Sequence, residues 1–187
     1  MFNDILSFLL QIVLSLLGTV FLFRAWLYFI RMPPFNPYSQ GIFKVTDWAV
    51  VPLHKLVKST RYVDTASLIC AWVCAFLYLV GGWLLITGLG VPLELLPKIA
   101  LAAVLTLIKW VLNITLWLVL IQVILSWVNP TAPIMPLLLS LTSPLMDPVR
   151  KRMPNTGAID FSPLIVLIAI QVLNMITQRL IFALIAV

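Results

Sequence analysis

The chain has 187 residues, of which 63% are hydrophobic and only 10% are charged. Soluble domains average about 45–50% apolar and about 25% charged residues, so this composition excludes an ordinary soluble fold and indicates an integral membrane protein. The formal net charge is +6. Basic residues of a membrane protein reflect its orientation and its contacts with anionic lipid headgroups, so we expect the bilayer as a partner and no nucleic acid.

Four segments are apolar and long enough to cross a bilayer. The first covers about residues 5–30 and the second about 66–89. The third lies within 99–128, and the fourth runs from 163 to 187. None shows the alternation of a barrel strand, and a helix satisfies its own backbone hydrogen bonds in lipid. We therefore predict an all-α membrane protein with four transmembrane helices.

The third segment is longer than one perpendicular span requires, and Lys109 interrupts its apolar run. Trp110 and Trp127 are 17 positions apart. That separation corresponds to about 25 Å of helix, which is close to one hydrocarbon thickness. We expect the span to cover residues 110–128 with a tryptophan at each interface, and residues 92–108 to form a separate surface helix. One long tilted helix is the alternative.

Lysine and arginine gather in two of the three connections between these segments. The first connection carries Arg31, Lys44, Lys55, Lys58 and Arg61, and the third carries Arg150, Lys151 and Arg152, whereas the second has only Lys98. The positive-inside rule places the two basic loops in the cytoplasm and both termini outside. Asp4 stands where a signal peptide has positive charges, so we expect the first helix to be retained.

The two basic loops are copies of one pattern. A shift of 96 positions aligns Thr46 with Thr142, Pro52 with Pro148, Lys55 with Lys151, and Asp64 with Asp160. We therefore expect two parallel helix–loop–helix repeats, residues 1–90 with loop 31–65 and residues 91–187 with loop 129–162. Parallel repeats are related by an axis along the membrane normal, so the two loops would face each other at the cytoplasmic surface.

Each loop contains an apolar run of about ten residues, which is too short to span a bilayer. We expect short amphipathic helices there, either interfacial or re-entrant. Pro136 can start such a helix, and Pro144 and Pro148 would bend or end it. The basic side chains of the loops are our candidates for binding lipid headgroups and partner proteins: Lys55, Lys58, Arg61, Arg150, Lys151 and Arg152.

An aspartate precedes the second and the fourth span at matching positions. Asp64 comes before Thr65, and Asp160 comes just before Ser162-Pro163, which is a strong helix start. Helix capping is the structural interpretation of both carboxylates. The functional hypothesis is that Asp64 and Asp160 pair across the axis and bind a cation or basic residues.

Polar side chains inside the spans are few. Gln171, Asn174 and Gln178 recur at helical spacing on one face of the fourth span, which indicates interhelical hydrogen bonds or, alternatively, a polar conduit. His54 is the only histidine, which excludes a metal site with several histidine ligands and argues against a nucleophile activated by a histidine. We predict no enzyme activity, no metal and no cofactor.

The second half contains three distinctive motifs: Ser126-Trp127-Val128-Asn129-Pro130, the run from Leu141 to Lys151, and the run from Gly157 to Pro163. Together they closely resemble the YggT family of bacterial inner-membrane proteins. The first half is similar to two-repeat members through Arg24-Ala25-Trp26 and Val63-Asp64-Thr65. Many members have an arginine before the Ser-Trp motif, where this chain has Gln122.

The resemblance implies a multi-pass protein of the bacterial inner membrane with periplasmic termini. Family members are linked to osmotic-stress tolerance and ion homeostasis, and plastid relatives to cofactor assembly of a cytochrome complex. We therefore expect a non-enzymatic scaffold or assembly factor whose cytoplasmic loops contact lipid and other membrane proteins or further copies of itself. The alternative is a small ion channel or transporter with a path along the axis between the repeats.

Overall fold

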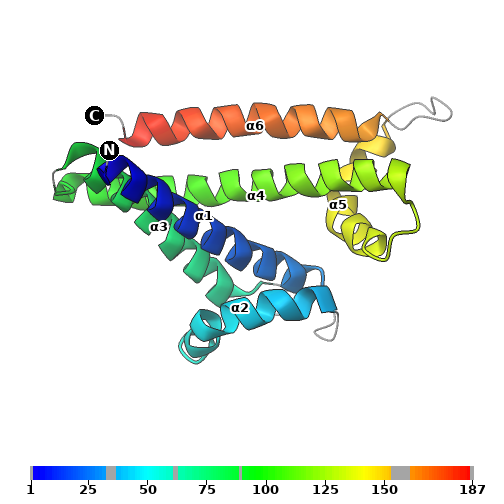
Figure 1. Cartoon of the computed structure of the whole chain (residues 1–187), viewed down its shortest axis with the longest axis horizontal. Coiled ribbons are helices and arrows are strands. Elements are labelled where there is room, and N and C mark those ends of the chain that lie inside the picture. The colour runs from blue at the N-terminus through cyan, green and yellow to red at the C-terminus, as the bar shows by residue number, and fades with distance from the viewer. Residues whose placement is uncertain (1, 33–36, 61–62, 89, 153–160, 186–187) are drawn as a thin grey trace. The chain divides into compact units, whose positions relative to one another are not determined.

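The computed structural model describes residues 2–32, 37–60, 63–88, 90–152 and 161–185. Within these ranges every regular element is a helix (Figure 1): α1 Phe2–Phe29, α2 Pro37–His54, α3 Thr65–Thr87, the short 3-10 helix η1 Leu93–Leu95, α4 Leu96–Val128, α5 Met135–Arg150 and α6 Ser162–Ile185. The helices α1, α3, α4 and α6 are long and apolar enough to cross a membrane. The prediction of an all-helical fold with four helices long and apolar enough to span is confirmed over the described residues, whereas the parallel arrangement of the repeats stays a prediction.

The helix α4 differs from the prediction because it is one unbroken helix of 33 residues. Its single proline, Pro97, stands in the first turn, and no proline or glycine follows before Val128. A lysine is a good helix former, so Lys109 changes the polarity of α4 without ending it. The expected separate helix over 92–108 is therefore wrong, and the helix is continuous as in the alternative, whereas the start of the span at 110 stays a prediction.

Trp110 also has a different role from the expected interfacial one. It lies in the middle of α4 and is only 6% exposed. Its ring lies over Gly18 of α1, where a methyl group would be 2.1 Å from the ring, and it meets the ring of Tyr78 edge-on at 5.8 Å. Trp110 is therefore an interhelical packing residue that depends on the missing side chain of Gly18.

The chain divides into two compact units, Met1–Val111 with Thr177–Val187, and Leu112–Ile176. In the first unit α1 and α3 lie side by side and antiparallel, and α2 packs where α1 ends and α3 begins (Figure 1). Ala71 and Ala75 of α3 are fully buried, and a methyl group on Gly81 would be 2.8 Å from Leu10 of α1. Small side chains thus allow these two helices to approach closely.

In the second unit α5 packs against the last turns of α4 and the first turns of α6. Met146 of α5 forms a core with Val119, Val166 and Ile170. The helix α5 continues through Pro144 and Pro148 to Arg150. Pro144 has no N–H for the carbonyl of Ser140, and the hydroxyl of Ser143 donates to that oxygen instead, at 3.4 Å.

Candidate functional site: a buried charge junction at the first loop

Arg24 fixes the loop helix α2 to the first span. It lies in α1 less than two turns before the helix ends and is only 8% exposed. Its Nη1 donates to Thr46 Oγ1 at 2.6 Å and to Asp47 Oδ1 at 2.7 Å, both on α2. The guanidinium also lies over the ring of Phe43, 5.0 Å from the ring centroid. One buried cation thus holds the inner face of α2.

Asp64 brings the start of α3 to the same point. Its carboxylate is 2% exposed, and its Oδ2 is 3.7 Å from Arg24 Nε. The same carboxylate accepts from the backbone N–H of Ser67 at 3.3 Å and from the Ser67 hydroxyl at 2.6 Å. Asp64 therefore caps α3, as predicted, and also neutralises Arg24.

The last residue of α2 completes the cluster. His54 Nε2 is 3.3 Å from Asp64 Oδ1, and Ser59 Oγ is 3.2 Å from both His54 Nδ1 and Asp64 Oδ1. We call Arg24, Thr46, Asp47, His54 and Asp64 the Arg24 junction. It joins α1, α2 and the start of α3 through side-chain hydrogen bonds and ion pairs.

In the second unit an uncharged hydrogen bond between a span and a loop helix corresponds to the Arg24–Thr46 contact. Gln122 of α4 and Thr142 of α5 are both buried, and Gln122 Oε1 is 2.5 Å from Thr142 Oγ1. Thr142 Oγ1 is also 2.8 Å from the carbonyl of Leu138, as Thr46 Oγ1 is 2.7 Å from that of Ile42. Thr142 Oγ1 thus approaches two acceptors, Gln122 Oε1 and the Leu138 carbonyl, and its single proton serves one of them at a time, whereas Thr46 accepts from Arg24.

The basic loop residues lie at the ends of the loop helices. Lys55 and Lys58 follow α2 and are exposed. Arg150 is the last residue of α5, Lys151 and Arg152 follow it, and all three are exposed. Arg61 lies outside the described residues. These side chains are accessible to lipid headgroups and partners, whereas Arg24, Thr46 and Asp64 of the Arg24 junction are buried.

Asp160 also lies outside the described residues, so its predicted pairing with Asp64 stays a prediction. Two members of the predicted polar stripe bond to α4. Asn174 Nδ2 donates to Asn113 Oδ1 at 3.3 Å, and Lys109 Nζ donates to Gln178 Oε1. Gln171 is exposed. The stripe thus links α6 to α4 at two points, in the way that interhelical hydrogen bonds do in membrane bundles.

The sequence profile of the CCB3/YggT family matches residues 3–85 and 101–181, which covers two repeats and most of the chain. The chain belongs to the CCB3/YggT family. It is 34% identical to the protein YggT of Escherichia coli K12 over 171 residues, which is 91% of this chain and 87% of the relative. A Vibrio alginolyticus protein is 31% identical over 90% of this chain and 91% of its own length.

A Pseudomonas aeruginosa protein is 30% identical over 93% of this chain and 88% of its own length. No solved structure matches the chain. The names of these relatives state no activity, so they transfer none to this CCB3/YggT protein. Membership of the family confirms the resemblance that the loop motifs indicated.

Of the Arg24 junction and the Gln122–Thr142 pair in this CCB3/YggT protein, only Asp64 was predicted as a site residue from the sequence, and six residues were not: Arg24, Thr46, Asp47, His54, Gln122 and Thr142. A signal for Arg24 existed, because an arginine inside an otherwise apolar span requires a partner. The agreement of Thr46 with Thr142 in the repeat marked the second partner. Asp47 has no counterpart at the matching position, which is Ser143, so the repeat pattern hid it.

Proposed function

We propose that this protein is a non-enzymatic scaffold or assembly factor of the bacterial inner membrane. Its two cytoplasmic loops would bind anionic lipid headgroups and partner membrane proteins. In this proposal the loops belong to two parallel repeats, residues 1–90 and 91–187, with both termini in the periplasm, and α2 and α5 lie at the cytoplasmic interface. The observation that carries the proposal is that α2 is fixed on one face and exposed on the other.

The outward face of α2 has the composition of an interfacial binding surface. Trp48 is 68% exposed, and Val45, one turn before it, is also exposed. Exposed lysines flank them, Lys44 on the helix and Lys55 just after it. Tryptophan and lysine together favour the headgroup level of a bilayer and protein contacts made there. The opposite face, with Thr46 and Val50, is buried against α1 and α3.

The loop helix α5 supports the same function. It buries Leu141 and Met146 towards α4 and α6, and it exposes Leu139 and Leu145. Its last turn leads into the basic run Arg150-Lys151-Arg152. Each basic side chain near an anionic membrane surface contributes about 1 kcal/mol to the free energy of binding. Each loop therefore combines a fixed helix, an exposed apolar face and a basic end.

In-cell photo-crosslinking tests this proposal. A photoreactive amino acid in place of Trp48 should give protein adducts of defined mass, and one at Leu139 should give adducts from the second loop. The matched control is Trp117, which is also exposed, at 61%, but stands within the span α4. It should label lipid and give no such adducts. Replacing Lys55 and Lys58 by glutamine should reduce the Trp48 adducts.

Flux through reconstituted protein separates the scaffold from the ion channel. Proteoliposomes that carry the protein should release potassium no faster than empty liposomes. Potassium flux well above that of empty liposomes, together with no protein adducts at Trp48 or Leu139, would overturn the scaffold in favour of the channel or transporter.

A further inference from the structure

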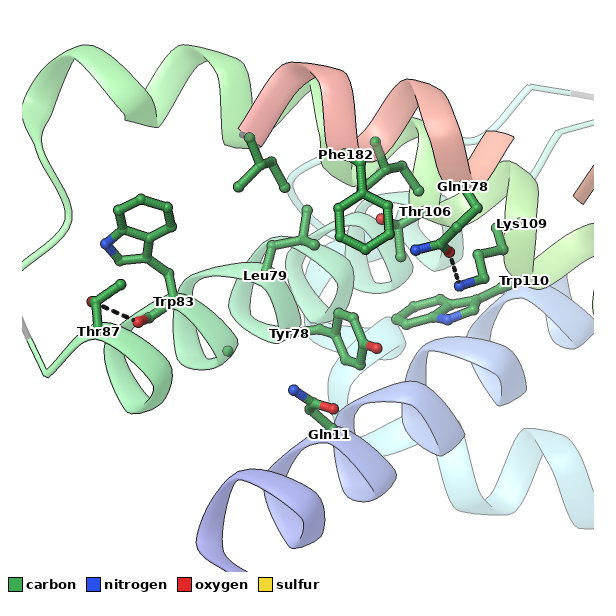
Figure 2. A pocket seen from close by; sticks show the side chains of 13 residues that line it. Gln11, Tyr78, Leu79, Trp83, Thr87, Thr106, Lys109, Trp110, Gln178 and Phe182 are labelled. Atoms are coloured by element: carbon green, nitrogen blue, oxygen red, sulfur yellow. Dashed lines mark hydrogen bonds between the residues drawn. The ribbon is translucent and has the colours of Figure 1, made fainter. Parts of the chain in front are cut away.

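A pocket of about 470 Å³ lies in the first unit, away from the Arg24 junction. Its walls come from α1, α3, the first half of α4 and the end of α6 (Figure 2). It extends from Tyr78, in the middle of α3, to Thr87, the last residue of that helix. Nine residues of helix correspond to about 14 Å, so the pocket runs from mid-span to the end of α3. Its volume is within the range of small-molecule sites, about 300–1,000 Å³.

The inner part of the pocket holds the positively charged side chain of Lys109. Lys109 Nζ donates to Gln178 Oε1, and Figure 2 shows the two side chains together on the pocket wall. Among the described residues no carboxylate is paired with Lys109. A neutral amide compensates an ammonium only in part, and an ionisable group inside a span is costly, so its presence indicates a candidate functional site.

The donors around Lys109 are arranged to receive an anion. The ammonium has two more protons after its bond to Gln178, and the amide of Gln178, whose oxygen is occupied, keeps its NH₂ as a donor. The apolar walls near these donors are aromatic: Tyr78, Trp110 and Phe182 (Figure 2). Charge-assisted hydrogen bonds are stronger in such a low-dielectric place than in water.

We propose that this pocket binds an organic anion with an apolar body. Its carboxylate or phosphate contacts Lys109 and Gln178, and its chain or ring lies along the aromatic wall towards the end of α3. Medium-chain fatty acids and lipids with an anionic head share this chemistry. The site is separate from the loop surfaces, so it does not depend on the scaffold function.

The first test uses wild-type protein in nanodiscs of zwitterionic phosphatidylcholine. The probe is a bromine-substituted medium-chain fatty acid, which quenches tryptophan on contact, and Trp83 and Trp110 line the pocket. The acid should quench saturably, and its methyl ester, which has no charge, should need at least about tenfold higher concentration. Equal quenching by acid and ester would overturn the proposal. This comparison needs no variant, so it stands even if a substituted protein fails to fold.

The second test assigns the binding to Lys109. Lys109→Met should weaken quenching by the acid at least about tenfold and leave quenching by the ester unchanged. Lys98→Met is the matched control, because Lys98 is on the same helix, is exposed and is not part of the pocket. Unchanged binding of the acid to Lys109→Met would overturn the proposal. Displacement of the probe by phosphatidylglycerol would identify a bilayer lipid as the source of the anion, and displacement only by free fatty acid would identify a soluble one.

Discussion

The two loop helices are attached at matching points by different chemistry. In the first repeat Arg24 donates to Thr46 and contacts two carboxylates. In the second repeat Gln122 meets Thr142, a neutral pair. The threonine hydroxyl approaches the carbonyl four residues earlier in both helices. The repeat has therefore kept the threonine of the anchor, while the span residue that meets it differs in charge and, because Arg24 aligns with Leu120, in position.

The difference extends to what else holds each helix. Along α5 the buried face is mostly hydrocarbon, and Met146 belongs to a core with α4 and α6. Along α2 the side chains with nearly complete burial include Ser39 and Thr46 beside Val50. We infer that α2 depends on the ions of the Arg24 junction, whereas α5 depends on apolar packing. A structural role alone thus explains the ions of the Arg24 junction.

Arg24→Met should have the largest effect on stability. Removing the cation leaves the carboxylate of Asp64 buried without its partner, which costs about 3 kcal/mol or more. Gln122→Met in the second repeat removes the uncharged hydrogen bond to Thr142, so it should lower the free energy of unfolding by about 1–2 kcal/mol. The measurement is denaturant unfolding of both variants in the same detergent, together with limited proteolysis at residues 55–60. Equal losses in the two variants would contradict the contrast between an ionic and a neutral anchor.

Substitutions of Asp64 distinguish the effect of its charge from its role as a helix cap, and they should have the next largest effect on stability. Asp64→Asn keeps an oxygen for the N–H of Ser67 but loses the charge that faces Arg24, so we expect it to cost about 2 kcal/mol. Asp64→Ala also loses the cap and should cost about 1 kcal/mol more.

The double variant Arg24→Gln with Asp64→Asn is the control for Asp64. It gives the first repeat the neutral chemistry of the second, and it should be more stable than the sum of the two single losses predicts. Full stability of Asp64→Asn would show that Asp64 acts only as a cap.

Hydropathy and loop motifs predicted the four spans and the family, because both depend on local sequence. The capping role of Asp64 was predictable for the same reason. The continuity of α4 could not be predicted in this way. A lysine interrupts the apolar run and so suggests the end of a segment, but it does not interrupt the helical backbone. The position of Trp110 depends on Gly18, which is on another helix and has no side chain to indicate a contact.

The Arg24 junction could be predicted only in part. An arginine inside a span requires a partner, but its contacts, Thr46 and Asp47, are 22 and 23 positions away. They meet Arg24 because α2 folds back onto α1, and that packing is a tertiary event that no local pattern encodes. The clustering of the basic loop residues indicates a binding surface, whereas Arg24 stands alone among apolar neighbours and gives no such pattern.

The threonine anchors should show the smallest single effects and the clearest difference between the repeats. Thr46→Val and Thr142→Val each remove one hydroxyl of nearly unchanged volume, and each should cost about 1–2 kcal/mol. Replacing both partners in the second repeat, Gln122→Leu with Thr142→Val, leaves no unsatisfied group, so the loss should shrink towards zero. The same treatment of the first repeat, Arg24→Leu with Thr46→Val, still removes the buried cation that faces Asp64 and should stay as costly as Arg24→Met. Unfolding of the four proteins in one detergent measures this, and recovery in both repeats would show that the charges of the first loop are dispensable.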